Sequence, residues 1–107
     1  KARSARIQQA TIEASRVPLE TAKECARVLD LAGPAARITN AQAIGDVIMA
    51  AYLAEAALKG AVDNIYINLR GVKDQEAVGK LKEEAQAVSQ GQREKVEAAV
   101  RDGMARL

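Results

Sequence analysis

Apolar residues recur at helical spacing along nearly the whole chain. The longest apolar run begins at the helix-start pair Thr39-Asn40 and is apolar on nearly every face as far as Leu58, with Asp46 and Glu55 as its only charges. A surface helix shows one apolar stripe, whereas a helix that is apolar all round is enclosed by other helices. We therefore expect this segment to form the central helix of a bundle.

Two further helices are predicted before this central one. The first spans about residues 2–16, and Pro18 marks a break or kink, because proline restricts the residue before it and is well accepted at a first helical position. A second helix is predicted to start there and to end at Gly33-Pro34. The apolar face of the first helix is expected to consist of Ile7, Ala10 and Ala14, with Ile12 near its edge.

The remainder of the chain also has helical periodicity. Residues 63–69 fit an alternating strand pattern as well as a helix, but we favour a helix because a lone strand has nothing to pair with. In the last segment, from Val72 to Leu107, Ser89-Gln90-Gly91 interrupts the apolar row, so two helices and one irregular helix are equally consistent. Spacings of three and four, typical of a coiled-coil seam, join Val78, Leu81, Ala85 and Val88.

Composition limits the classes of function. The 107 residues suffice for one small domain. Only 2% of them are aromatic and alanine supplies much of the apolar content, so each helix buries little apolar area. We therefore expect the chain to self-associate. A net charge of +2 without a basic, aromatic stripe argues against nucleic-acid binding. Charges in the central helix argue against a membrane span, and we expect a soluble, cytoplasmic protein. The chain has no histidine, and its lone Cys25 excludes an intrachain disulfide or a cysteine metal cluster.

Few residues remain as candidates for chemistry. Asp46 either performs a task or lies in the first helical turn and favours the helix dipole. Asp46 and Glu55 are nine residues apart and therefore lie on opposite faces of one helix, so they are no acid–base pair. Asn64 and Asn68 share a helix face; their amides either bind the polar edge of a ligand or cross-link helices. We predict no metal site and no bound prosthetic group.

Two stretches, IEASRVPLETAKECARVLDLA and NAQAIGDVIMAAYLAEAALKGAVDNIYINL, resemble the later part of the cyclodeaminase/cyclohydrolase family. That family includes the cyclodeaminase half of formiminotransferase-cyclodeaminase and bacterial methenyltetrahydrofolate cyclohydrolases. Its pattern is similar to IEA-x-x-VPL, then N-P-N-A-x-S-D, then L-x-x-A-A-x-x-G-A-x-x-N-x-x-I-N-L. The resemblance covers residues 12–69, and order, spacing and identities agree together.

The resemblance implies an all-α, homodimeric enzyme that acts on a one-carbon tetrahydrofolate derivative as substrate. Asp46 matches the family's active-site carboxylate, which would transfer a proton or stabilise the cationic one-carbon unit. Asn40, Asn64 and Asn68 match residues implied to bind substrate. Gly45 and Ala41 depart from the family's Ser and Pro.

The family's N-terminal helices and Pro-Gly-Gly-Gly-Ser segment have no counterpart in residues 1–107, so we expect one partial domain of this type, completed by dimerisation or by those helices. Two functional classes follow. The first is a folate enzyme, either a formiminotetrahydrofolate cyclodeaminase or a methenyltetrahydrofolate cyclohydrolase. The second is a helical oligomerisation module, or a truncated relative, without activity.

Overall fold

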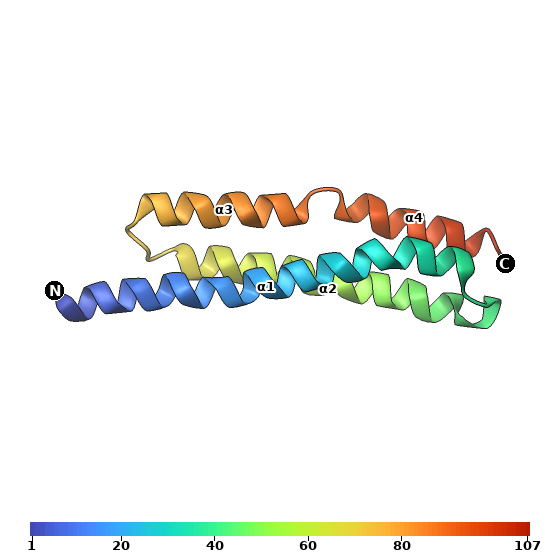
Figure 1. Ribbon diagram of the computed structural model, residues 1–107, viewed down its shortest axis with the longest axis horizontal. Coiled ribbons are helices and arrows are strands. Elements are labelled where there is room, and N and C mark those ends of the chain that lie inside the picture. The colour runs from blue at the N-terminus through green and yellow to red at the C-terminus, as the bar shows by residue number, and fades with distance from the viewer.

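The computed structural model describes residues 1–107 as helices joined by short turns, which confirms the all-α prediction. In chain order these are α1 (Ala2–Ile38), the short 3-10 turn η1 (Ala41–Ala43), α2 (Ile44–Leu69), α3 (Gln75–Ser89) and α4 (Gln92–Met104). α1 and α2 run antiparallel, and α3 and α4 follow one another as a third rod along the same side of that pair (Figure 1). The molecule is therefore a thin three-rod bundle.

The prediction of two helices before residue 39 was wrong, because α1 continues through both Pro18 and Pro34. Each proline removes one backbone hydrogen bond from the helix interior. The residues after them are nevertheless held by packing, since Leu19, Ala22 and Ala36 are all almost fully buried. Tertiary burial on both sides of each proline therefore outweighs its local cost.

Two apolar clusters divide the length of the bundle. One lies where α1, α2 and α4 meet, and the other joins the first half of α1 to the end of α2 and to α3. The predicted apolar face of the first helix was wrong, because Ile7, Ala10 and Ala14 are exposed. The buried face is instead formed by Ile12, Ser15 and Leu19, and the Ser15 hydroxyl is satisfied by donating to the Thr11 carbonyl at 3.0 Å.

α2 is covered on one side only, which corrects the expectation that it would be enclosed. Leu58 and Ile65 are buried, but Met49, Leu53 and Ile67 are among the exposed large apolar residues of the molecule. Residues 63–69 are helical, as favoured. By length and composition, the segment Ala41–Leu69 could cross a membrane, and 28% of its most apolar window is buried in the bundle.

The open question about the last segment is resolved in favour of two helices. Gly91 has φ 75°, a left-handed backbone conformation that interrupts the helix, so that α3 ends before it and α4 begins after it. The predicted seam of α3 is confirmed by the burial of Val78, Leu81 and Ala85. In α4 the buried face includes Val96, Ala99 and Gly103, whereas Met104 is exposed.

The loop between α2 and α3 is tied to α1 by one side chain. Gln8 donates from Nε2 to the Gly71 carbonyl at 2.9 Å, and its Oε1 accepts from the Lys73 amide at 2.8 Å. The bundle is long and narrow, with extents of 62 × 18 × 15 Å and a radius of gyration of 17.4 Å. A compact chain of this length would have a radius of gyration near 13 Å, so much of the surface of α1 and α2 has no neighbour within the chain.

Candidate functional site

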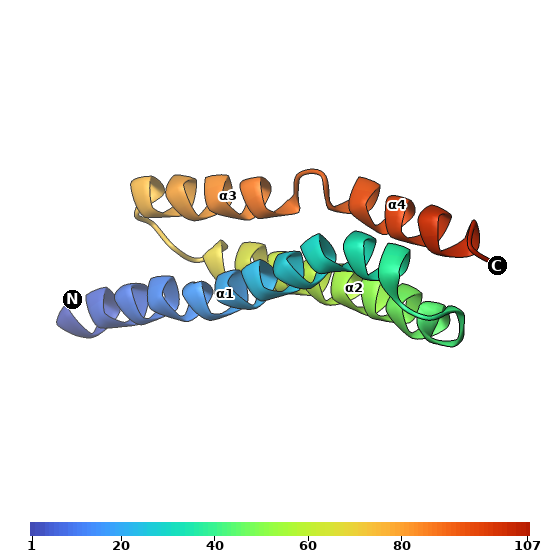
Figure 2. The same cartoon turned by 45° about the vertical axis from the view of Figure 1, so that its right-hand side comes forward.

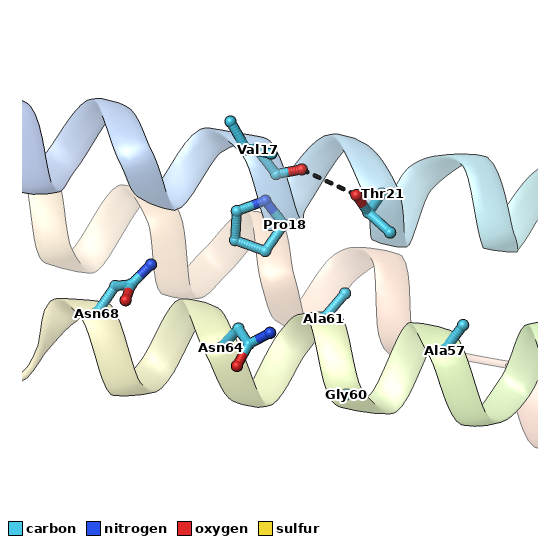
Figure 3. Close-up of a pocket in the computed structure, with 8 residues that line it drawn as sticks. All are labelled: Val17, Pro18, Thr21, Ala57, Gly60, Ala61, Asn64 and Asn68. Atoms are coloured by element: carbon cyan, nitrogen blue, oxygen red, sulfur yellow. Dashed lines mark hydrogen bonds between the residues drawn. The ribbon is translucent and has the colours of Figure 1, made fainter.

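A groove of about 560 Å³ runs between α1 and α2 near the middle of the bundle. α1 contributes the turn around Pro18, and α2 contributes one face of three helical turns. Figure 3 shows the Pro18 ring projecting toward α2, with the Asn64 and Asn68 side chains on the other helix. The groove is lined by Val17, Pro18, Thr21, Ala57, Gly60, Ala61, Asn64 and Asn68.

Small side chains keep this groove open. A Cβ atom built on Gly60 would have no heavy atom within 4 Å, apart from its own helix backbone and chain neighbours. α2 continues through Gly60, and no other part of this chain packs against its open face. Glycine in a helix interior costs about 1 kcal/mol relative to alanine, and nothing within this chain offsets that cost. The open position suits the close approach of something that is not part of the chain.

The polar groups of the groove are free to bind. Asn64 and Asn68 make no side-chain hydrogen bond within the chain, while Thr21 donates its hydroxyl hydrogen to the Val17 carbonyl at 3.2 Å. The two amides offer donors and acceptors on one helix face, as predicted, and they do not cross-link helices. None of the eight lining residues can titrate near neutral pH, so the groove can hold a ligand but contains no acid or base.

The structure places Asp46 far from this groove. Asp46 is exposed in the first turn of α2 and has neither a hydrogen-bond nor an ion-pair partner. Eighteen residues separate it from Asn64, which corresponds to about 27 Å along the helix and five full turns. The two side chains thus share one face of α2 but cannot touch the same ligand atom. The first-turn position satisfies the dipole interpretation.

Asn40 also lies apart from the groove. It precedes η1, and its side-chain oxygen accepts a hydrogen bond from the Ala43 amide at 3.0 Å. This cap confirms the helix-start signal at Thr39-Asn40 and uses the oxygen atom, although the amide hydrogens remain free. Within one chain, the structure therefore brings together Asn64 and Asn68 but leaves Asn40 and Asp46 at the far end of α2.

A buried carboxylate in α2 has a structural partner. The Glu55 side chain is 10% exposed and accepts from Arg93 of α4 at 2.8 Å. Sequence reasoning placed Glu55 opposite Asp46, which the structure confirms, but it did not identify Arg93. Arg93 lies next to the Gly91 turn, and that turn was the available signal for a new helix start. No group of three or more His, Cys, Asp or Glu residues is arranged to hold a metal ion.

Comparison with known proteins places the chain in a family. The family model described as formiminotransferase-cyclodeaminase matches residues 1–87, which include both walls of the groove. The chain belongs to this family. The chain is also similar to a curated protein, the methenyltetrahydrofolate cyclohydrolase of Methylorubrum extorquens, with 40% identity over 73 residues. That match covers 68% of this chain and 35% of the relative, so the chain spans well under half of that protein. No solved structure matches the chain significantly.

The departures from the formiminotransferase-cyclodeaminase pattern lie outside the groove. Gly45 and Ala41 both sit at the η1 end of α2 and are exposed, and a Cβ on Gly45 would meet nothing within 4 Å. The groove itself includes the Val17-Pro18 pair of α1 and the glycine and two asparagines of α2, in the spacing of the pattern quoted above. The part of the family pattern that lines a pocket is therefore intact.

Proposed function

We propose that the protein acts in folate one-carbon metabolism, first as a methenyltetrahydrofolate cyclohydrolase and second as a formiminotetrahydrofolate cyclodeaminase. One observation carries the proposal: the two motif segments of the family, separated by about forty residues, meet as the two walls of one groove. The name of the relative supports the first activity, and the description of the family supports the second. Either activity uses a tetrahydrofolate derivative as substrate, without a prosthetic group.

The groove suits a flat heterocycle with a polar edge. Small residues on α2 leave room beside the Pro18 ring, so an aromatic ring can pack against apolar surface. The amides of Asn64 and Asn68 can pair with the alternating donors and acceptors of a pterin edge, because each amide offers both kinds of group. Such polar contacts fix the orientation of a ligand whose binding energy comes mainly from apolar burial.

A carboxylate completes the chemistry. In the hydrolase reaction, water attacks the cationic methenyl carbon, one carbon–nitrogen bond breaks, and a proton is released to give the formyl derivative. In the deaminase reaction, the secondary amine nitrogen N10 attacks the protonated formimino carbon on N5, the proton of N10 is passed to the departing nitrogen, and ammonia leaves to give the methenyl derivative. Both reactions pass through a cationic one-carbon unit and need a proton acceptor. We assign these roles to Asp46 because it matches the family's carboxylate and has no competing partner in the chain. Since it lies about 27 Å from Asn64 along α2, this assignment requires that the assembled protein bring Asp46 to a groove other than the one beside its own Asn64.

The substitution Asp46→Asn tests this assignment. We expect turnover to fall about a hundredfold or more, because the amide keeps the volume but loses the charge and the basic site. Stability should change by only about 0.3–1 kcal/mol, the value of a first-turn charge. The assay follows the absorbance of methenyltetrahydrofolate as it is hydrolysed, or as it forms from the formimino substrate, together with a melting curve.

Asp63→Asn is the matched control, since Asp63 is an exposed aspartate of the same helix that does not line the groove. Its turnover should equal that of the unmodified protein. Normal turnover in a folded Asp46→Asn protein would remove Asp46 from the mechanism. A well-folded parent chain with neither activity would favour the second class, an oligomerisation module without chemistry.

We further propose that the protein is a soluble, cytoplasmic homodimer. The exposed apolar residues of α1 and α2 support self-association, and Glu55 paired with Arg93 supports a helix packed in a bundle rather than in lipid. Sedimentation velocity at micromolar concentration tests the dimer, and a folded monomer alone would contradict it.

A further inference from the structure

The polar side chains of the groove lie toward its two ends. Asn64 and Asn68 of α2 lie toward one end. Thr21 of α1 lies toward Ala57 at the other end, and the Pro18 ring lies between (Figure 3). Thr21 carries the only hydroxyl among the eight lining residues. The proposed function gives the two amides a partner but leaves this hydroxyl without one.

The hydrogen bond of Thr21 determines what its hydroxyl offers to the groove. Oγ1 donates its only hydrogen to the Val17 carbonyl of the same helix at 3.2 Å. A hydroxyl oxygen that has donated its hydrogen still has lone pairs that accept hydrogen bonds. Thr21 is exposed within the chain, so these lone pairs are accessible. Toward a molecule in the groove, Thr21 therefore acts as an acceptor.

No other polar side chain lines the groove around Thr21. Val17, Ala57 and Ala61 end in methyl groups, and Gly60 has no side chain. None of the lining residues belongs to α3 or α4, which lie along one side of the α1–α2 pair in Figure 2 as in Figure 1, so neither helix closes the groove to water. A water molecule in this part of the groove has Thr21 as its only side-chain partner within the chain.

The two amides set the direction in which a bound tetrahydrofolate lies. Its pyrimidine ring presents the donors and acceptors, whereas the one-carbon unit is attached to N5 of the second ring and to N10 beyond it. When Asn64 and Asn68 bind the pyrimidine ring, the one-carbon unit points along the groove toward Thr21. Asn64 and Ala57 are seven residues apart, about 10 Å along the helix axis, which leaves room for the second ring.

We propose that Thr21 is a positioning residue that holds the attacking water of the hydrolase reaction. The inference rests on the proposed function and names how the groove holds its second substrate. Oγ1 accepts one hydrogen of the water, so that a lone pair of the water oxygen faces the cationic methenyl carbon.

The reaction then follows in two steps. The water oxygen bonds to the methenyl carbon and gives its other proton to the carboxylate acceptor proposed above. The bond from this carbon to N5 then breaks, and N5 takes the remaining hydroxyl proton. The products are the formyl derivative on N10 and one released proton. Thr21 gains and loses no proton in either step, so its part is to place the water.

The two proposed activities differ in their need for this water. In the deaminase reaction the nucleophile is N10 of the substrate, so no water takes part in forming the methenyl derivative. Loss of the Thr21 hydroxyl should therefore slow hydrolysis and spare deamination. A hydroxyl that only stabilised α1 or the walls of the groove would affect both reactions alike.

Thr21→Val removes the hydroxyl and keeps the branched shape of the side chain. We expect kcat for hydrolysis of methenyltetrahydrofolate to fall about tenfold to a hundredfold. KM and the rate of formation of methenyltetrahydrofolate from the formimino substrate should stay unchanged, because neither depends on the water. Thr21→Ser keeps the hydroxyl and should hydrolyse nearly as fast as the parent protein. Thr21→Ala removes the same oxygen with a better helix former and should reproduce the valine result.

Thr11→Val is the matched control. Thr11 is another threonine of α1 whose hydroxyl donates four residues back, to the Ile7 carbonyl at 2.8 Å, but it does not line the groove. Its hydrolysis and deamination rates should equal those of the parent protein. A melting curve of each variant shows that the compared proteins are folded.

The inference and the proposed function fail in different ways. Unchanged hydrolysis by folded Thr21→Val and Thr21→Ala, or an equal fall in both reactions, would overturn the role of Thr21 and leave the proposed function standing. An equal loss in Thr11→Val would do the same. A parent protein that deaminates without hydrolysing would also overturn this role, since its reaction uses no water. A folded parent protein with neither activity would refute the proposed function and this inference with it.

Discussion

Replacing Pro18 by alanine should make the protein more stable and less able to bind its ligand. Pro18 lies inside α1 without an N–H group, so the carbonyl of Ala14 lacks its helical partner. Proline in a helix interior is about 3 kcal/mol less favourable than alanine. Only part of this difference should be recovered, because α1 already accommodates the ring and Ala14 is exposed to water. We expect the free energy of unfolding to rise by about 1–2 kcal/mol, which corresponds to a melting temperature higher by about 5–15 °C.

The same change should weaken ligand binding. The Pro18 ring projects into the groove (Figure 3), and its loss removes apolar contact with a bound heterocycle. A ring face that buries about 50 Å² contributes about 1 kcal/mol, equivalent to a several-fold rise in KM for methenyltetrahydrofolate. Stability and binding are therefore expected to move in opposite directions, as is common for residues that serve a site.

Pro34→Ala is the matched control for both measurements. Pro34 lies in the same helix and removes the same kind of hydrogen bond, but it is exposed and does not line the groove. It should raise the melting temperature by a similar amount and leave KM unchanged. A lower melting temperature for Pro18→Ala alone would show that the ring is needed for packing α1 on α2. Equal kinetics for the two variants would refute the groove as the binding site.

The remaining predictions concern glycines. Gly103→Ala should destabilise the protein by about 1–3 kcal/mol in urea unfolding, because the new Cβ would lie 3.0 Å from Cγ2 of the fully buried Ile44; a stabilised variant would refute that packing. Gly91→Ala should cost about 1–2 kcal/mol for its left-handed φ of 75°, and Gly91→Asn less; equal effects of the two would contradict the strain argument. Gly79→Ala, in open space within α3, should instead raise stability by up to about 1 kcal/mol, and a loss would show a neighbour at that position.

The helical class and the α3 seam could be predicted because they depend on local spacing. The continuity of α1 could not, since the sequence shows the local cost of Pro18 and Pro34 but not the burial of Leu19 and Ala36 that outweighs it. The buried side of the first helical segment was misassigned for a related reason. Ser15 is small enough to pack in the core and satisfies its hydroxyl within the helix, so a polar residue marks a buried position.

The candidate site was predictable only in part. Asn64 and Asn68 share a helix face, as their spacing of four predicted, but the groove that they form with Pro18 depends on how α1 packs on α2. The open side of α2 was missed because hydrophobicity on every side of this helix was taken to mean burial within one chain. That pattern does not distinguish neighbours in the same chain from neighbours in another one.

The side chain of Gln8 has a consequence for how the molecule opens. Its two hydrogen bonds supply a partner for the Gly71 carbonyl and for the Lys73 amide, two backbone groups of a loop that has no helical partners there. The loop after α2 is thereby coupled to the second turn of α1, although more than sixty residues separate them in sequence. Fraying of the start of α1 and release of the α2–α3 loop should then be one cooperative event, so that this end of the rod behaves as a single unit in hydrogen exchange.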